Sequence, residues 1–194
     1  MANFDSNRWY LITNADEGLS IVGTETVLTD DTTSVQPYGA VFLRLSNTSD
    51  IQQQWQIFRI NDTIVLRCRS CGPDAYMGTA THLQAESDLL VAGNTKPIMG
   101  GARALGVAAL WELGNWQDGY YWMENAANGS AWHLNQTGGF LTMSSNITAT
   151  QPQQRFQFRQ QGEINDAGYS TIDVRFTNGI FHLEPSGNCN AHSY

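Results

Sequence analysis

The chain has 194 residues, of which 41% are hydrophobic and 11% aromatic, a composition that supports one domain with a real core and argues against disorder. Only 14% of the residues are charged, the net charge is −8, and Lys and Arg form no cluster. This charge pattern argues against nucleic-acid partners and against attraction to anionic membrane surfaces. Because no run of 18 apolar residues occurs, we also expect no direct membrane insertion of this chain.

Three segments of the chain share one internal spacing. Each opens with a short apolar run and closes with an aromatic residue inside a second strand-like run. Trp55 and Leu66 are 11 residues apart, as are Trp111 and Trp122, and the first two segments repeat after 55 to 56 residues. One unit of this kind cannot bury its own apolar face, so it packs against its copies. The repeat therefore predicts one closed, pseudo-threefold all-β domain.

Alternation of residue types and turn-forming residues also indicate strands and turns. Apolar and polar residues alternate over 41–45, 55–60 and 156–159, which is typical of half-buried strands. The stretch 82–90 tolerates a helix but reads better as a short turn. The span 93–106 is rich in Gly and Ala, and we predict a long loop there.

The closing runs carry a family resemblance. Gln53-Gln54-Trp55 and Gln154-Arg155-Phe156 match a Gln-X-aromatic (QxW) pattern, and together with the three β units the chain resembles the ricin-B-type β-trefoil lectins in a divergent, fungal-like form. The resemblance covers about residues 7–160. It implies a scaffold role for the motif, in which the ring fills the core and the Gln side chain ties loops together. We therefore expect Trp55, Trp111 and Phe156 to form one core layer.

The same resemblance implies a domain organisation. We expect a ricin-B-like β-trefoil over residues 1–162, with units at about 7–61, 62–117 and 118–162. A short C-terminal β extension over 163–194 does not fit the threefold count. It contains a predicted strand at 168–174 and an Asn-Gly hairpin at 176–181. The extension packs outside the barrel, leads toward a stalk, or contacts another chain, and the sequence leaves these three alternatives open.

Sugar recognition of the galactose type is what the family implies for function. The family site uses an acidic residue on the second strand of a unit, an aromatic platform on the third, and Asn or Gln before the motif. The acid position falls on Val22, Gly78 and His133 in the three units. The third unit is the least altered, because it retains Gln153 and Gln154. The candidate carbohydrate-binding residues are Trp132, His133, Asn135, Phe140, Gln153 and Gln154 in the third unit, and Gln52 and Gln53 in the first.

Uncharged polar and aromatic residues also suit sugars on physical grounds, because amides bond hydroxyls and flat rings meet apolar C–H faces. The structural alternative is that these rings are ordinary core and rim aromatics. We predict a non-catalytic, lectin-like protein whose partners are glycans or glycoproteins. The alternative is a trefoil that has lost its sugar sites and binds a protein, as an inhibitor or secreted effector would, through the loop 91–106.

Enzymatic function has little support in the sequence. No nucleophile elbow, zinc-protease motif or phosphate-binding loop occurs. The four histidines, His82, His133, His182 and His192, are scattered along the chain. We expect no catalysis, no cofactor and no metal site.

Three cysteines leave the redox state open. Cys68 and Cys71 form a Cys-X-X-Cys pair before a Gly-Pro-Asp turn, which predicts a local structural disulfide. Pairing of Cys189 with one of them, or three reduced thiols, are the alternatives.

Five Asn-X-Ser/Thr sequons favour a secreted or extracellular chain, with glycans on surface loops. They lie at Asn47, Asn61, Asn128, Asn135 and Asn146. The polar N-terminus has no signal-peptide pattern, so we expect a mature or recombinant form whose leader was replaced by Met1. The alternative is a cell-surface protein whose anchor is missing from this chain.

Overall fold

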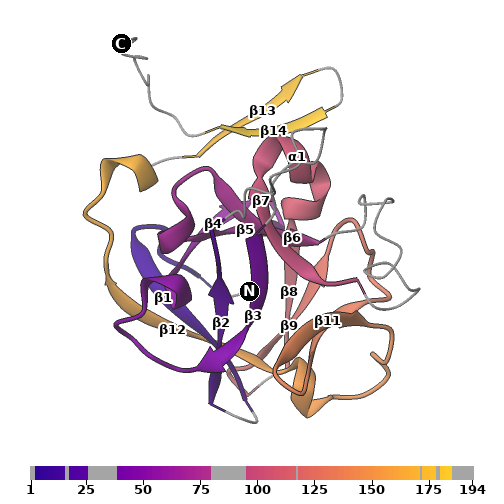
Figure 1. The fold of residues 1–194 in the computed structure, drawn as a ribbon. Coiled ribbons are helices and arrows are strands. Elements are labelled where there is room, and N and C mark those ends of the chain that lie inside the picture. Colours follow the sequence, from indigo (N-terminus) through magenta and orange to yellow (C-terminus); the bar gives the residue numbers. More distant parts are fainter. Residues whose placement is uncertain are drawn as a thin grey trace, which may run out of the picture.

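A computed structural model describes residues 3–15, 18–25, 39–79, 95–116, 118–170, 172–177 and 180–184, and it is all-β apart from single-turn helices (Figure 1). The strands are β1 (Arg8–Asn14), β2 (Leu19–Gly23), β3 (Gly39–Leu45), β4 (Trp55–Ile60), β5 (Thr63–Cys68), β6 (Ala75–Thr79), β7 (Pro97–Gly101), β8 (Trp111–Asn115), β9 (Tyr121–Asn125), β10 (His133–Thr137), β11 (Phe140–Ser144), β12 (Phe156–Glu163), β13 (Asp173–Thr177) and β14 (Ile180–Glu184). The helical turns are α1 (Ala102–Leu105) and the 3₁₀ helices η1 (Ile51–Gln53), η2 (Arg69–Cys71), η3 (Gly106–Ala109), η4 (Pro152–Gln154) and η5 (Ala167–Tyr169).

Six strands close into a ring. β1 pairs with β4, β4 with β5, β5 with β8, β8 with β9, β9 with β12, and β12 returns to β1, all antiparallel. The remaining strands of each unit form the hairpins β2–β3, β6–β7 and β10–β11. Three four-stranded units that contribute two strands each to a barrel, and one hairpin each to its cap, make a β-trefoil. The predicted fold class is thus confirmed.

Three aromatic rings fill the centre of the barrel. Trp55 on β4, Trp111 on β8 and Phe156 on β12 are each 0% exposed and belong to one hydrophobic cluster. The indole nitrogen of Trp55 donates a hydrogen bond of 2.8 Å to the carbonyl oxygen of Ile21, and that of Trp111 donates one of 2.8 Å to Met77. Both acceptors lie 34 residues before the donor. The repeat in the sequence therefore reflects an equivalent contact in two units.

The prediction of a long loop over 93–106 is wrong for the described residues. This part of the chain forms β7, α1 and the start of η3, and Ile98 and Met99 of β7 are buried. A Cβ atom at Gly78 on β6 would lie 2.6 Å from the carbonyl oxygen of Ala108. The small residues of this span thus reflect close packing of a helical segment on β6, not a free loop.

The predicted bridge between Cys68 and Cys71 is also not formed, because both are free thiols. Cys68 is fully buried at the end of β5, where its sulfur lies 3.4 Å from the carbonyl oxygen of Gln52. A hydrogen bond from the Cys71 thiol lowers the pKa of Cys68 to about 7 despite this burial. Hydrogen bonds satisfy the pair without a covalent bond. Cys189 and the predicted turn at 82–90 lie outside the described residues.

After β12 the chain crosses the outside of the barrel. We call residues 164–170 the strap. Its backbone begins with a hydrogen bond of 3.0 Å from the amide of Ile164 to the carbonyl oxygen of Asn7. Ile164 and Tyr169 are buried together with Trp9 of β1. Residues 167–169 form η5, so the strand predicted at 168–174 starts only at Asp173.

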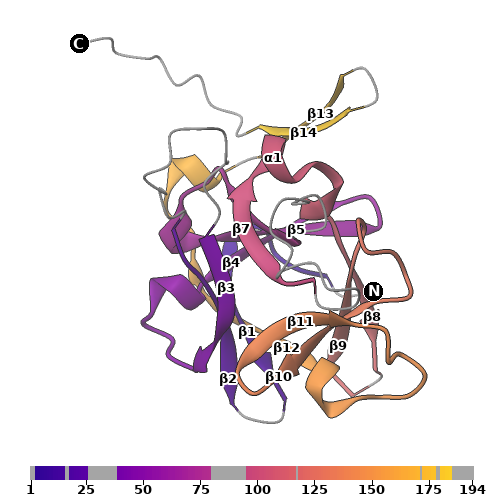
Figure 2. The same cartoon turned by 45° about the vertical axis from the view of Figure 1, so that its right-hand side comes forward.

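At the end of the described chain, β13 and β14 pair antiparallel, which confirms the predicted strand pairing, whereas Asn178 and Gly179 of the predicted turn lie outside the described residues. The two strands form a separate two-stranded sheet and lie beside α1 in both views (Figures 1 and 2). The described part of the extension packs against the outside of the trefoil, and residues 185–194 lie outside the described residues, so a stalk and a contact with another chain stay predictions.

The indole hydrogen bond generates a test of the core. Trp111→Phe keeps a ring but removes the donor to Met77. We expect the free energy of unfolding to fall by about 1–3 kcal/mol, because a buried acceptor loses its partner. Urea denaturation measures the change. Trp132→Phe, at a half-buried position, is the control and should cost less than about 1 kcal/mol. Equal losses in the two variants would contradict this role for the indole nitrogen.

Candidate functional site

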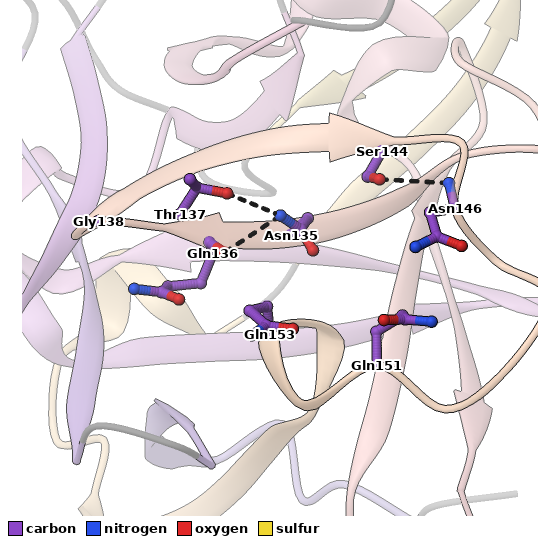
Figure 3. A pocket seen from close by; sticks show the side chains of 8 residues that line it. All are labelled: Asn135, Gln136, Thr137, Gly138, Ser144, Asn146, Gln151 and Gln153. Atoms are coloured by element: carbon purple, nitrogen blue, oxygen red, sulfur yellow. Dashed lines mark hydrogen bonds between the residues drawn. The ribbon is translucent and has the colours of Figure 1, made fainter.

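The third unit carries a pocket of about 410 Å³ between the β10–β11 hairpin and the turn before β12. Figure 3 shows the lining side chains around this opening, with Gln151 and Gln153 facing the strand that carries Asn135. The full lining is Asn135, Gln136, Thr137, Gly138, Ser144, Asn146, Gln151 and Gln153. Every polar group in this lining is an amide or a hydroxyl, and none is charged. Such a surface can donate to and accept from ligand hydroxyls.

A buried glutamine holds the wall of this pocket. The side-chain nitrogen of Gln154 donates a hydrogen bond of 3.0 Å to the carbonyl oxygen of Asn146, which lies eight residues earlier in the chain. In the first unit, Gln53 donates 3.0 Å to the carbonyl oxygen of Leu45, again eight residues earlier. Both glutamines are 0% exposed. The Gln of the motif thus ties the preceding loop to the barrel in both units, as the family resemblance implies.

The second unit solves the same problem differently. Ala109 occupies the position of the motif glutamine and is fully buried. Asn125 of β9 supplies the missing amide. Its side-chain nitrogen donates a hydrogen bond of 2.7 Å to the carbonyl oxygen of Ala108, and its side-chain oxygen accepts one of 3.0 Å from the hydroxyl of Thr79. The second unit therefore retains a tied loop without the motif.

His133 stands where the family places an acid, and it faces inward. It is 6% exposed and stacks on Trp122, with ring centroids 4.5 Å apart and an angle of 5° between planes. Trp116 meets it edge-on at 6.2 Å. Because the nitrogen of Gln154 donates to Asn146, its oxygen accepts from Nδ1 of His133 at 3.1 Å. This assigns the proton to Nδ1, and burial lowers the pKa of the imidazole.

A glycine makes room for this stack. Gly114 on β8 lies opposite Trp122 on β9, and a Cβ atom at Gly114 would overlap the indole ring. The ring therefore lies flat over the glycine and presents its other face to His133. Gly114, Trp122, His133 and Gln154 form a continuous support that ends at the pocket wall.

The structure brings together only part of the predicted site. Asn135 and Gln153 line the pocket, whereas His133 and Gln154 lie buried behind it. Phe140 is 68% exposed and does not line the pocket.

The other predicted residues lie apart from this pocket. Trp132 is half-buried against the central core cluster. Gln52 and Gln53 belong to the first unit, where the connection between β2 and β3 falls mostly outside the described residues.

Sequence reasoning missed Gln136, Thr137, Ser144, Asn146 and Gln151. Thr137 and Asn146 carry a signal in the sequence, because they belong to sequons, but a sequon by itself predicts glycosylation. The sequons are placed as follows: Asn47, Asn61 and Asn146 are exposed, and Asn128 and Asn135 are half-buried.

Acidic and metal-binding groups do not enter this pocket. Glu124 on β9 lies opposite His133 on β10 in the strand register and is 8% exposed. Burial raises the pKa of the Glu124 carboxyl, and the charge of Glu112 is a second cause. No group of three or more His, Cys, Asp or Glu that could hold a metal ion occurs among the described residues. The arrangement can therefore bind hydroxyl groups through neutral hydrogen bonds.

Comparison with solved structures places the fold among known β-trefoils. The chain is similar to a ricin B-like lectin of Macrolepiota procera in complex with lactose (16% identity, TM-score 0.54, covering 82% of this chain and 100% of the lectin). It is similar to the designed threefold-symmetric protein ThreeFoil (15% identity, TM-score 0.56, covering 80% of this chain and 99% of ThreeFoil). It is also similar to a salivary protein from Culex quiquefasciatus of the Cysteine and Tryptophan-Rich family (11% identity, TM-score 0.58, covering 83% of this chain and 98% of the salivary protein).

No protein-family model and no curated protein sequence matches the chain. At identities this low the likeness establishes the fold alone, which is a β-trefoil. Within the described ranges, no helix is long and apolar enough to span a membrane.

The aromatic support of the site can be tested at its base. Gly114→Ala forces the Trp122 ring away from β8. We expect a loss of about 1–3 kcal/mol in the free energy of unfolding, because overpacking displaces the whole stack. The matched control is Gly162→Ala, where a Cβ atom would meet nothing within 4 Å. Thermal and urea unfolding compare the two variants. A Gly114→Ala protein as stable as the control would show that the stack tolerates displacement.

His133 predicts a pH dependence of stability. Its folded-state pKa lies below the usual value of 6.5, so the unfolded chain binds the proton more tightly. Stability is therefore retained above about pH 6.5 and lost as the pH falls toward the folded-state pKa. Urea denaturation at pH 7 and pH 5 should show a smaller loss for His133→Asn, which keeps a donor for Gln154, than for the unaltered chain. Glu124 acts in the opposite direction in both proteins, and parallel curves would contradict the prediction.

Proposed function

We propose that the protein binds glycans without catalysis, through the pocket of the third unit. The observation that carries the proposal is the lining: side-chain amides and hydroxyls from β10, β11 and the turn before β12 converge on one opening. Neutral hydrogen bonds of this kind match sugar hydroxyls in both directions. The lectin-like fold supports the proposal at the level of ligand class.

The third unit has a histidine at the position where the family site has an acidic residue. A carboxylate that accepts two hydroxyls is the strongest anchor in a shallow sugar site. Here His133 occupies that position and is used to orient Gln154. Binding then depends on several weaker hydrogen bonds, so we expect low affinity for one sugar unit and gain from multivalent display.

Secretion forms part of the same proposal and is supported by the exposed sequons. Asn47 and Asn61 lie exposed, away from the pocket lining, and suit glycan attachment. Asn135 and Asn146 line the pocket, and a glycan on either would occupy it. We therefore assign these two side chains to ligand contact.

The alternative of a protein-binding loop at 91–106 has less support. Residues 91–94 lie outside the described residues, and Ile98, Met99 and Leu105 are buried in the fold. An exposed binding loop needs accessible side chains, and these three are used for packing.

A glycan array followed by calorimetry tests the proposal. For a glycan found on the array, Gln153→Ala should weaken binding by about three- to tenfold, because one neutral hydrogen bond is worth about 0.5–1.5 kcal/mol. Gln153 is exposed, so its truncation should leave the unfolding midpoint unchanged. The matched control is Gln52→Ala, the equivalent position before the motif glutamine in the first unit. Silence across a broad array, or equal weakening in both variants, would remove the third-unit site.

A further inference from the structure

A second cavity, of about 420 Å³, lies between the strap and the barrel, and it shares no lining residue with the third-unit pocket; we call it the strap pocket. Its walls come from β1, η2, the end of β12 and the beginning of the strap. The lining residues are Trp9, Arg69, Glu163, Asn165, Asp166 and Ala167. It combines carboxylates, an amide, a guanidinium and an indole, whereas the polar groups that line the third-unit pocket are amides and hydroxyls.

The barrel side of this cavity is held rigidly. The guanidinium of Arg69 lies 5.4 Å from the centre of the Trp9 ring, and its Nη1 donates 2.7 Å to the side-chain oxygen of Gln54. Tyr169 of the strap meets Trp9 edge-on at 5.0 Å and donates its hydroxyl, at 2.9 Å, to the carbonyl oxygen of Arg69. Trp9 is only 4% exposed, so most of its ring supports the wall.

The strap side keeps polar atoms available. One oxygen of Asp166 accepts 2.9 Å from the amide of Gly168, and one oxygen of Glu163 pairs with Arg8 at 2.8 Å. Within the described residues, the second oxygen of the Asp166 and Glu163 carboxylates and the side-chain amide of Asn165 make no hydrogen bond. These groups are the ones left to meet a ligand.

Charge and chemistry narrow the ligand. Two carboxylates and one guanidinium line the cavity, so a simple anion is disfavoured. No metal-binding group of three or more His, Cys, Asp or Glu occurs in the described chain. A neutral polyhydroxylated molecule fits best, because carboxylates accept hydroxyl donors while Arg69 and Asn165 donate to ring and hydroxyl oxygens. The volume lies within the range of small-molecule sites.

We propose that the strap pocket is a binding site for one neutral saccharide unit, built by the C-terminal extension and independent of the third-unit pocket. Asp166 accepts hydroxyl groups through its free oxygen, Asn165 adds an amide, and Arg69 donates from the Trp9 side. The extension thereby supplies a carboxylate, whereas the acid positions of the three units carry Val22, Gly78 and His133.

Nuclear magnetic resonance titration of the full chain with galactose, N-acetylgalactosamine, mannose and lactose tests this site. We expect saturable shifts at the Trp9 indole, the Asn165 side chain and the Gly168 amide with at least one of these probes. Asp166→Asn keeps an oxygen that caps Gly168 but removes the charge, and should weaken binding about tenfold.

Two further variants keep the experiment decisive. Asn165→Ala removes an exposed side chain and should weaken binding without altering the fold. Asp62→Asn makes the same change as Asp166→Asn at an exposed position on the β4–β5 turn and should bind normally. Gln153→Ala should also leave the strap-pocket shifts unchanged, which separates this site from the third-unit pocket. No shift with any of the four probes, or equal affinity of Asp166→Asn and Asp62→Asn, overturns the proposal.

Discussion

The whole structure depends on filling a closed six-stranded barrel with side chains from its own strands. A barrel of this size has no space for solvent, so large rings must meet at its centre. Trp55, Trp111 and Phe156 meet that requirement from equivalent strands. Two of them also bind a buried carbonyl through the indole nitrogen. Once this centre is occupied, the hairpins and loops outside it can vary without endangering closure, and the candidate sites lie in those outer parts.

The sequence predicted what the barrel constrains and missed what depends on neighbours. The spacing of the closing aromatics and the alternating strands predicted the trefoil, because core packing repeats with the unit. The loop predicted over 93–106 is wrong because small residues suit both loops and tight packing, and the sequence does not show that Gly78 packs against Leu105 and Ala108. Gln136 and Gln151 carried no signal, since they become neighbours only when the hairpin and the turn converge.

His133 has a structural role at the position where the family resemblance implies an acid. A buried imidazole between two indoles is a structural group: it is neutral, fixed in one tautomer and bonded to Gln154. The benefit passes to Asn146, whose carbonyl is held by the same glutamine. His133 and Gln154 thus stabilise the pocket wall, and the amides around the opening are the groups that we propose for ligand contact.

Arg67 explains why the strap stays against the barrel. It is 0% exposed and lies between the rings of Phe58 and Tyr169, at 5.0 and 5.2 Å from their centres. Its Nη2 donates 3.1 Å to the carbonyl oxygen of Tyr169, which also accepts 2.7 Å from Gln56. A buried cation is costly unless hydrogen bonds satisfy it, so removal of the strap would strip Arg67 of an acceptor and a ring face. Strap and barrel therefore hold each other, and the pocket between them has two preorganised walls, which lowers the cost of ordering on binding.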